Sequence, residues 1–179
     1  MSNSNLPPLG SDHVFSVSSS ALIDAPLEKV WAIMLDFPNY TKWNSFVRKM
    51  TMVSPSKVPL PDQTPVVGEH ITINVNMPPT MDEPGLFGTN TAFCVITHID
   101  GENYRVSWKT AGVPYFLLHT ERWQALSIDE ATGKTKYETV EAFGGILAYI
   151  TSFFFGDKLR VSFKAAADTL KAHAEQPGQ

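Results

Sequence analysis

Two consecutive β-hairpins that lead into one long amphipathic helix constrain the fold of this chain more than any other feature. Alternating apolar and polar residues predict four strands, at residues 89–99, 104–109, 115–128 and 135–143. Turn signals at Asp100-Gly101 and at residues 129–134 join these strands in pairs. The last segment, up to about Ala174, carries apolar residues at helical spacing: Leu159, Phe163, Ala166 and Leu170. Antiparallel strands with a terminal helix predict an α+β fold, in which the helix covers the concave side of a curled sheet.

The first half of the chain adds three strands and two short helical pieces. We predict the strands at residues 14–23, 48–53 and 69–77, which brings the total to about seven. A first helix begins after Pro26 and stops before Pro38, and residues 39–47 form a short second helix or a turn. Proline-rich residues 54–65 and the irregular stretch 78–88 are loops. We expect a disordered tail at residues 1–12 and a single domain over residues 13–175.

Composition and charge exclude several classes of partner. The net charge is -4 and the basic residues are scattered, so we expect neither nucleic acid nor an anionic membrane surface as a partner. The longest apolar stretch, residues 144–156, is too short to cross a bilayer, so stable membrane insertion is not expected. The single cysteine, Cys94, excludes an intrachain disulfide, and the N-terminus lacks the pattern of a signal peptide. We therefore expect a cytoplasmic protein; the sequence leaves its oligomeric state open, a homodimer included.

Several short motifs resemble those of a known superfamily. They are residues 23–31 (IDAPLEKVW), residues 36–40 (DFPNY) with Trp43-Asn44, Gly68-Glu69, Trp108, and residues 141–145 (EAFGG) before the final helix. With these motifs the chain resembles the SRPBCC (START/Bet v 1-like) superfamily, in particular its polyketide cyclase/dehydrase and lipid transport branch. The resemblance implies a helix-grip fold with an internal cavity between the sheet and the last helix. It implies no single activity, because the superfamily includes carriers, sensors and enzymes.

The last hairpin carries the predicted catalytic residues. In an extended strand His119, Glu121 and Trp123 share one face, and on the partner strand Glu141 shares a face with aromatic residues. The aromatic residues predict that both faces point inward. A turn centred near Glu130-Ala131 then places His119 opposite or diagonal to Glu141, with Glu121 close by. An imidazole and two carboxyl groups in an apolar cavity can relay a proton. Alternatively, these three side chains form a polar cluster with a purely structural role, or the register places them at the rim of the cavity.

Aromatic residues and one arginine are the predicted ligand contacts. They are Trp43, Arg48, Trp108, Tyr115, Trp123, Tyr137, Phe143 and Phe154. Any of these aromatic residues could instead belong to the ordinary core. No spacing of histidine, cysteine or carboxylate residues has a metal-site pattern, and no nucleotide motif is present, so we expect no metal and no cofactor.

Two functions agree with these features. The first is an enzyme of polyketide- or terpenoid-like specialised metabolism, which would bind an apolar small molecule and promote its cofactor-free cyclisation, dehydration or isomerisation. The alternative is a non-catalytic carrier or sensor of a lipid or another hydrophobic ligand. The ionisable residues of the last hairpin favour the enzyme, because a carrier needs no acid or base in its cavity.

Overall fold

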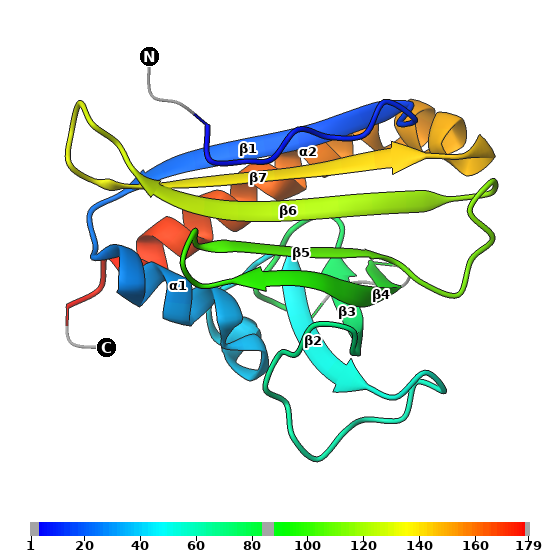
Figure 1. Cartoon of the computed structure of the whole chain (residues 1–179), viewed down its shortest axis with the longest axis horizontal. Helices are drawn as coiled ribbons and strands as arrows, with labels where there is room; N and C mark the ends of the chain where they lie inside the picture. The colour runs from blue at the N-terminus through cyan, green and yellow to red at the C-terminus, as the bar shows by residue number, and fades with distance from the viewer. Residues whose placement is uncertain (1–3, 84–87, 178–179) are drawn as a thin grey trace.

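A computed structural model of the chain describes residues 4–83 and 88–177, and its centre is a curved antiparallel sheet. The strands follow the order β1-β7-β6-β5-β4-β3-β2 across the sheet (Figure 1). In chain order the elements are β1 (Phe15–Ile23), α1 (Leu27–Leu35), the 3₁₀ helix η1 (Phe37–Lys42), β2 (Val47–Val53), β3 (His70–Asn76), β4 (Thr89–Asp100), β5 (Arg105–Thr110), β6 (His119–Ile128), β7 (Thr135–Gly144) and α2 (Ile146–Ala174). The order confirms the predicted α+β helix-grip fold.

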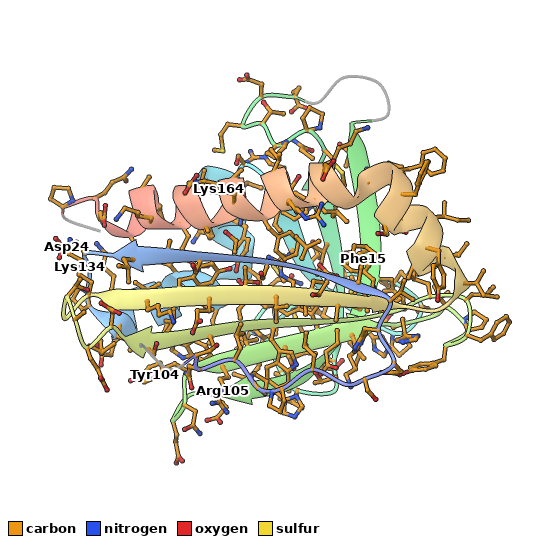
Figure 2. All side chains as sticks on the ribbon, turned by 90° about the horizontal axis from the view of Figure 1, so that it is seen from above. Phe15, Asp24, Tyr104, Arg105, Lys134 and Lys164 are labelled. Atoms are coloured by element: carbon orange, nitrogen blue, oxygen red, sulfur yellow. The ribbon has the colours of Figure 1, made fainter. Side chains whose placement is uncertain are left out.

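Helix α2 covers the concave face of the sheet. It lies behind β1 and β7 in Figure 1, and Figure 2 shows it on one side of these strands. Its buried residues include Leu159, Phe163, Ala166 and Leu170, as the helical spacing predicted. Each large apolar side chain that α2 buries stabilises the fold by about 1.5–3 kcal/mol. Among the helices that the structure describes, none is long and apolar enough to cross a membrane.

Two elements differ from the sequence prediction. Strand β6 begins at His119 rather than at Tyr115. The four residues before it form a turn, because the amides of Leu117 and Leu118 donate to the carbonyl oxygen of Pro114 at 2.9 and 3.2 Å. The second helical piece is the 3₁₀ helix η1, which starts at Phe37, with Pro38 in its first turn, and ends before the predicted segment does.

The N-terminal segment lies on the convex face of the sheet, opposite α2 (Figure 2). The side-chain amide of Asn5 donates to the carbonyl oxygens of Leu126 and Asn103, at 2.6 and 2.8 Å. Arg105 donates to the amide oxygen of Asn5 at 2.8 Å. A disordered tail was predicted for residues 1–12, so these contacts are a feature that the sequence did not indicate. They hold the chain around Asn5 against strands β5 and β6.

Candidate functional site

A small cavity lies between the concave face of the sheet and α2. Its lining consists of Tyr40, Trp43, Asn44, Val47, Met50, Trp108, Arg122, Gln124, Tyr137, Ala166 and Leu170. The volume is about 10 Å³, which is room for roughly one water molecule. Strands β6 and β7 supply the polar groups at its centre, and α2 closes it with small and aliphatic side chains. The site is therefore a polar spot within an apolar core.

Arg122 is the charged group of this cavity. Its side chain is nearly buried, and its guanidinium carbon lies 4.3 Å from the ring centre of Phe163 and 5.8 Å from that of Trp108. Its Nη1 atom lies 3.9 Å from Oε2 of Glu141. The Nε–H group is buried and has no hydrogen-bond partner among the described residues. A buried donor without an acceptor is destabilising, so this N–H group is suited to an oxygen atom of a ligand.

Glu141 lies beside Arg122 on the neighbouring strand, because the two residues are register partners. Burial raises the pKa of the Glu141 carboxyl group above its ordinary value. The positive charge of Arg122 and a hydrogen bond with Thr120 act in the opposite direction and only partly offset the effect of burial. A carboxyl group with a raised pKa holds its proton more tightly, which suits it to proton transfer.

Two phenols complete the polar lining. The hydroxyl group of Tyr137 donates to Oε1 of Gln124 at 2.7 Å, and that of Tyr40 donates to the carbonyl oxygen of Met34 at 2.7 Å. Burial raises the pKa of both hydroxyl groups, so both residues are neutral donors at physiological pH. Each hydroxyl group already has an acceptor in the protein, whereas the Nε–H group of Arg122 has none among the described residues.

A comparison with known families agrees with this arrangement of a curled sheet, a polar cavity and a C-terminal helix. The model of the family described as polyketide cyclase / dehydrase and lipid transport matches residues 14–175. The chain belongs to this family. The match confirms the resemblance inferred from the sequence motifs, and it spans every strand and helix from β1 to α2.

One relative by sequence and two solved structures are similar to the chain over most of its length. The "Oxopyrrolidines biosynthesis cluster protein O" of Penicillium oxalicum is 25% identical over 174 residues, which cover 88% of this chain and 85% of that protein. A hypothetical protein from Helicobacter pylori has a TM-score of 0.72 at 12% identity, covering 98% of this chain and 99% of that one. The Zhui aromatase/cyclase from Streptomyces sp. R1128 has a TM-score of 0.65 at 11% identity, covering 90% and 93%. At these identities the two structures show a common fold.

The predicted pairing of His119 with Glu141 is wrong. His119 pairs with Gly144, and Glu141 pairs with Arg122. This register joins odd-numbered residues of β6 to even-numbered residues of β7, so the odd-numbered residues of the two strands lie on opposite faces. Glu141 therefore faces α2 in this family member, whereas His119 and Glu121 lie on the convex face.

The neighbours of His119 and Glu121 also differ from the prediction. Glu121 accepts a hydrogen bond from Nε1 of Trp123 at 2.8 Å and lies 3.7 Å from the ammonium group of Lys109. His119 lies beside Asp12 of the N-terminal segment, at 3.5 Å between Nε2 and Oδ2. The sheet therefore lies between Glu141 and the other two predicted catalytic residues, His119 and Glu121, so the three side chains do not meet in one cavity.

Three of the predicted ligand contacts line the cavity, namely Trp43, Trp108 and Tyr137. The other five lie elsewhere. Phe143 is buried and stacks on Phe15, Trp123 packs against His98 on the convex face, Arg48 donates to the carbonyl oxygen of Asn44, and Tyr115 and Phe154 are largely exposed. Tyr115 lies in the loop before β6 and Phe154 in the first turns of α2, so neither lines the cavity as the sequence predicted.

A wider groove lies outside the cavity, between η1 and the C-terminal end of α2. It has a volume of about 510 Å³ and is lined by residues that include Ile33, Lys42, Trp43 and His173. The Trp43 ring belongs to both linings and stacks on the imidazole of His173 at 5.8 Å between ring centres. The Trp43 side chain therefore lies between the groove and the cavity.

Sequence reasoning missed Arg122 and Gln124 as site residues. The prediction instead took the face of β6 with His119, Glu121 and Trp123 as the inner one, whereas Arg122 and Gln124 lie on the other face. The aromatic Trp123 favoured the wrong face. On β7 the aromatic residues Tyr137 and Phe143 did indicate the inner face, and both are buried. The register between the two strands then decides which face of β6 lies beside them.

Proposed function

We propose that the protein binds an apolar small molecule that carries an oxygen acceptor, in the space between the sheet and α2. The observation that carries this proposal is the buried Nε–H group of Arg122, which lines the cavity and has no acceptor within the part of the chain that the structure describes. An alcohol, carbonyl or enolate oxygen of a ligand would satisfy this donor. The rings of Trp43 and Trp108 would contact the apolar part of the ligand.

We further propose that the reaction is a cofactor-free cyclisation, dehydration or isomerisation. Arg122 would stabilise negative charge that develops on the ligand oxygen, and Glu141 would donate or accept the proton that moves in the step. The family description and the biosynthesis-cluster relative support this class of reaction. His119 and Glu121 take no part in this mechanism, since the sheet lies between them and the cavity.

Binding requires the cavity to enlarge. A volume of about 10 Å³ does not hold a ring system, so the ligand must displace side chains of the lining. Trp43 is suited to this movement, because one side of its ring already contacts the outer groove. We propose that the ligand enters from this groove and that the indole of Trp43 moves aside.

The test of binding uses two probes that differ only in an oxygen atom, 2-naphthol and naphthalene. We expect the protein to bind 2-naphthol more tightly, and Arg122→Met to abolish the difference. Arg105→Met is the matched control, because Arg105 lies on the convex face against Asn5. Equal affinity of the unaltered protein for both probes would show that Arg122 does not recognise an oxygen atom.

The test of catalysis uses mass spectrometry of the small molecules that copurify with the protein and with Glu141→Gln. We expect the unaltered protein to copurify with a rearranged, cyclised or dehydrated product. The variant should copurify with the precursor that has not yet undergone this reaction. If both proteins copurify with the same unaltered lipid, the proposed catalysis is refuted and the protein is a carrier.

A further inference from the structure

A second cluster of polar side chains lies on the convex face, far from the cavity, where the N-terminal segment meets the start of β6. One ligand-type atom each from Asp12, His13 and His119 lies within 4.8 Å of the other two. The two imidazole side chains are only 10% and 13% exposed, whereas the Asp12 carboxylate is 52% exposed. Two nearly buried imidazoles with a carboxylate at the rim form a set of three donors that is typical of divalent transition metals.

The hydrogen bonds of His119 determine which of its nitrogen atoms is basic. Nδ1 lies 2.8 Å from the carbonyl oxygen of Tyr115. A carbonyl oxygen only accepts hydrogen bonds, so Nδ1 carries the proton, and Nε2 of the neutral ring carries a lone pair. Nδ1 of His13 has the same kind of contact with the carbonyl oxygen of Gly10, at 3.0 Å. Metal-binding histidines usually have this second contact, because it fixes the orientation of the ring.

The distance between His119 and Asp12 fits a shared cation better than a hydrogen bond. Nε2 is buried and has no hydrogen-bond partner in the described parts of the chain, and it faces Oδ2 of Asp12 at 3.5 Å. That separation exceeds the range of an N–H···O hydrogen bond. Two atoms that are each about 2.1 Å from a tetrahedral metal ion lie about 3.4 Å apart. A lone pair that faces a carboxylate is repulsive unless a cation lies between them.

The surroundings of the cluster also fit this interpretation. The Tyr115 hydroxyl group donates to Oδ2 of Asp12, and this hydrogen bond fixes the position of the carboxylate beside His119. The Tyr115 ring stacks on that of His119 at 3.8 Å. Gly144, the register partner of His119, leaves the space that the imidazole fills, because a Cβ atom there would lie 2.0 Å from Nε2.

We propose that Asp12, His13 and His119 bind one divalent transition-metal ion, with Zn²⁺ as the best fit, and that the ion fastens the N-terminal segment to the end of β6. The exposed side of Asp12 leaves a fourth position open to water. The site differs from the sequence expectation of no metal, because its residues come from two distant segments and have no local spacing pattern. It is independent of the proposed function of the cavity.

The experiment is a titration of the chelator-treated full chain with Zn²⁺ in competition with a chromophoric chelator. We expect one ion per chain, and a loss of affinity of more than about 100-fold in His119→Ala and in Asp12→Asn. Tyr115→Phe removes only the hydrogen bond to Asp12 and should weaken binding by about 10–100-fold. His70→Ala is the matched control, because it removes a histidine of β3 outside the cluster and should leave the affinity unchanged.

A structural role is measured separately. We expect Zn²⁺ to raise the Tm of the unaltered protein and of His70→Ala, but not that of Asp12→Asn. The Asp12 side chain is exposed, so Asp12→Asn should fold like the unaltered protein. The proposal is overturned if no stoichiometric ion binds, or if His119→Ala and His70→Ala bind Zn²⁺ equally. An imidazolium at His119 that persists near pH 7 in NMR titrations with Zn²⁺ present would also overturn it, since a proton would then be the bridging cation.

Discussion

Removal of the positive charge in the cavity is the sharpest test of its electrostatics. Arg122→Met leaves the Glu141 carboxylate in the core without the cation that lowers its pKa. Breaking one partner of a buried ion pair costs about 3–5 kcal/mol. Since the Glu141 side chain is still 18% exposed and the pair is separated by 3.9 Å, we expect the low end, about 3 kcal/mol at pH 7. Urea unfolding measures this loss.

The double variant tests whether the loss comes from the unpaired charge. Arg122→Met with Glu141→Gln removes both charges, so its free energy of unfolding should return to within about 1 kcal/mol of the unaltered protein. The two substitutions should therefore be non-additive by at least about 2 kcal/mol. Additivity to within about 0.5 kcal/mol would refute the coupling of these residues.

The same variants predict a dependence on pH with a definite sign. Burial raises the pKa of Glu141 above its ordinary value of 4.5, and without Arg122 it rises further. A folded state with the higher pKa binds the proton more tightly, so its stability is greatest below pH 4.5 and is lost as the pH rises through the folded-state pKa. Arg122→Met should therefore match the double variant near pH 4.5 and become less stable than it toward pH 7. A gap that is constant over this range would contradict the assignment to Glu141.

Three further predictions concern other parts of the core. Tyr137→Phe leaves a buried amide oxygen without its donor and should lower the free energy of urea unfolding by about 1–3 kcal/mol. Burial raises the pKa of the Cys94 thiol to about 12, so at pH 8 a thiol reagent should react only after guanidinium unfolds the chain. Gly133 has a positive φ of 69° and open space around it, so Gly133→Ala should cost about 1–2 kcal/mol for the strained backbone alone. Gly145→Ala, at φ of 86°, also places a Cβ atom 2.7 Å from backbone atoms and should lower the Tm more; equal shifts of Tm would contradict the close contact.

Most of the fold was predictable from local patterns. The Asp100-Gly101 turn, the alternation in β3 and the helical spacing in α2 each depend on residues close in sequence, and each was placed to within a few positions. The start of β6 was not, because the residues from Tyr115 to Leu118 are good strand formers. Their backbone instead closes a turn on Pro114, a contact that strand propensity does not describe.

The site was less predictable, because its identity depends on one choice of register. A shift of one residue between β6 and β7 exchanges the inner and outer faces of a strand. The sequence indicated which residues share a face of β6, but not that the face with Arg122 points toward α2. The Asp12–His13–His119 cluster could not be predicted from the sequence either, because it depends on the path of the N-terminal segment across the sheet.

The position of β1 at the edge of the sheet has a consequence for synthesis and folding. Residues 15–23 pair with residues 135–143, and α2, which follows them, packs on β1. A strand made early therefore finds its partner only after the rest of the sheet has left the ribosome. Such long-range pairing slows folding and leaves the early strand exposed to misassembly. Interruption of translation before β7 would leave a chain that contains six of the seven strands and cannot complete its sheet.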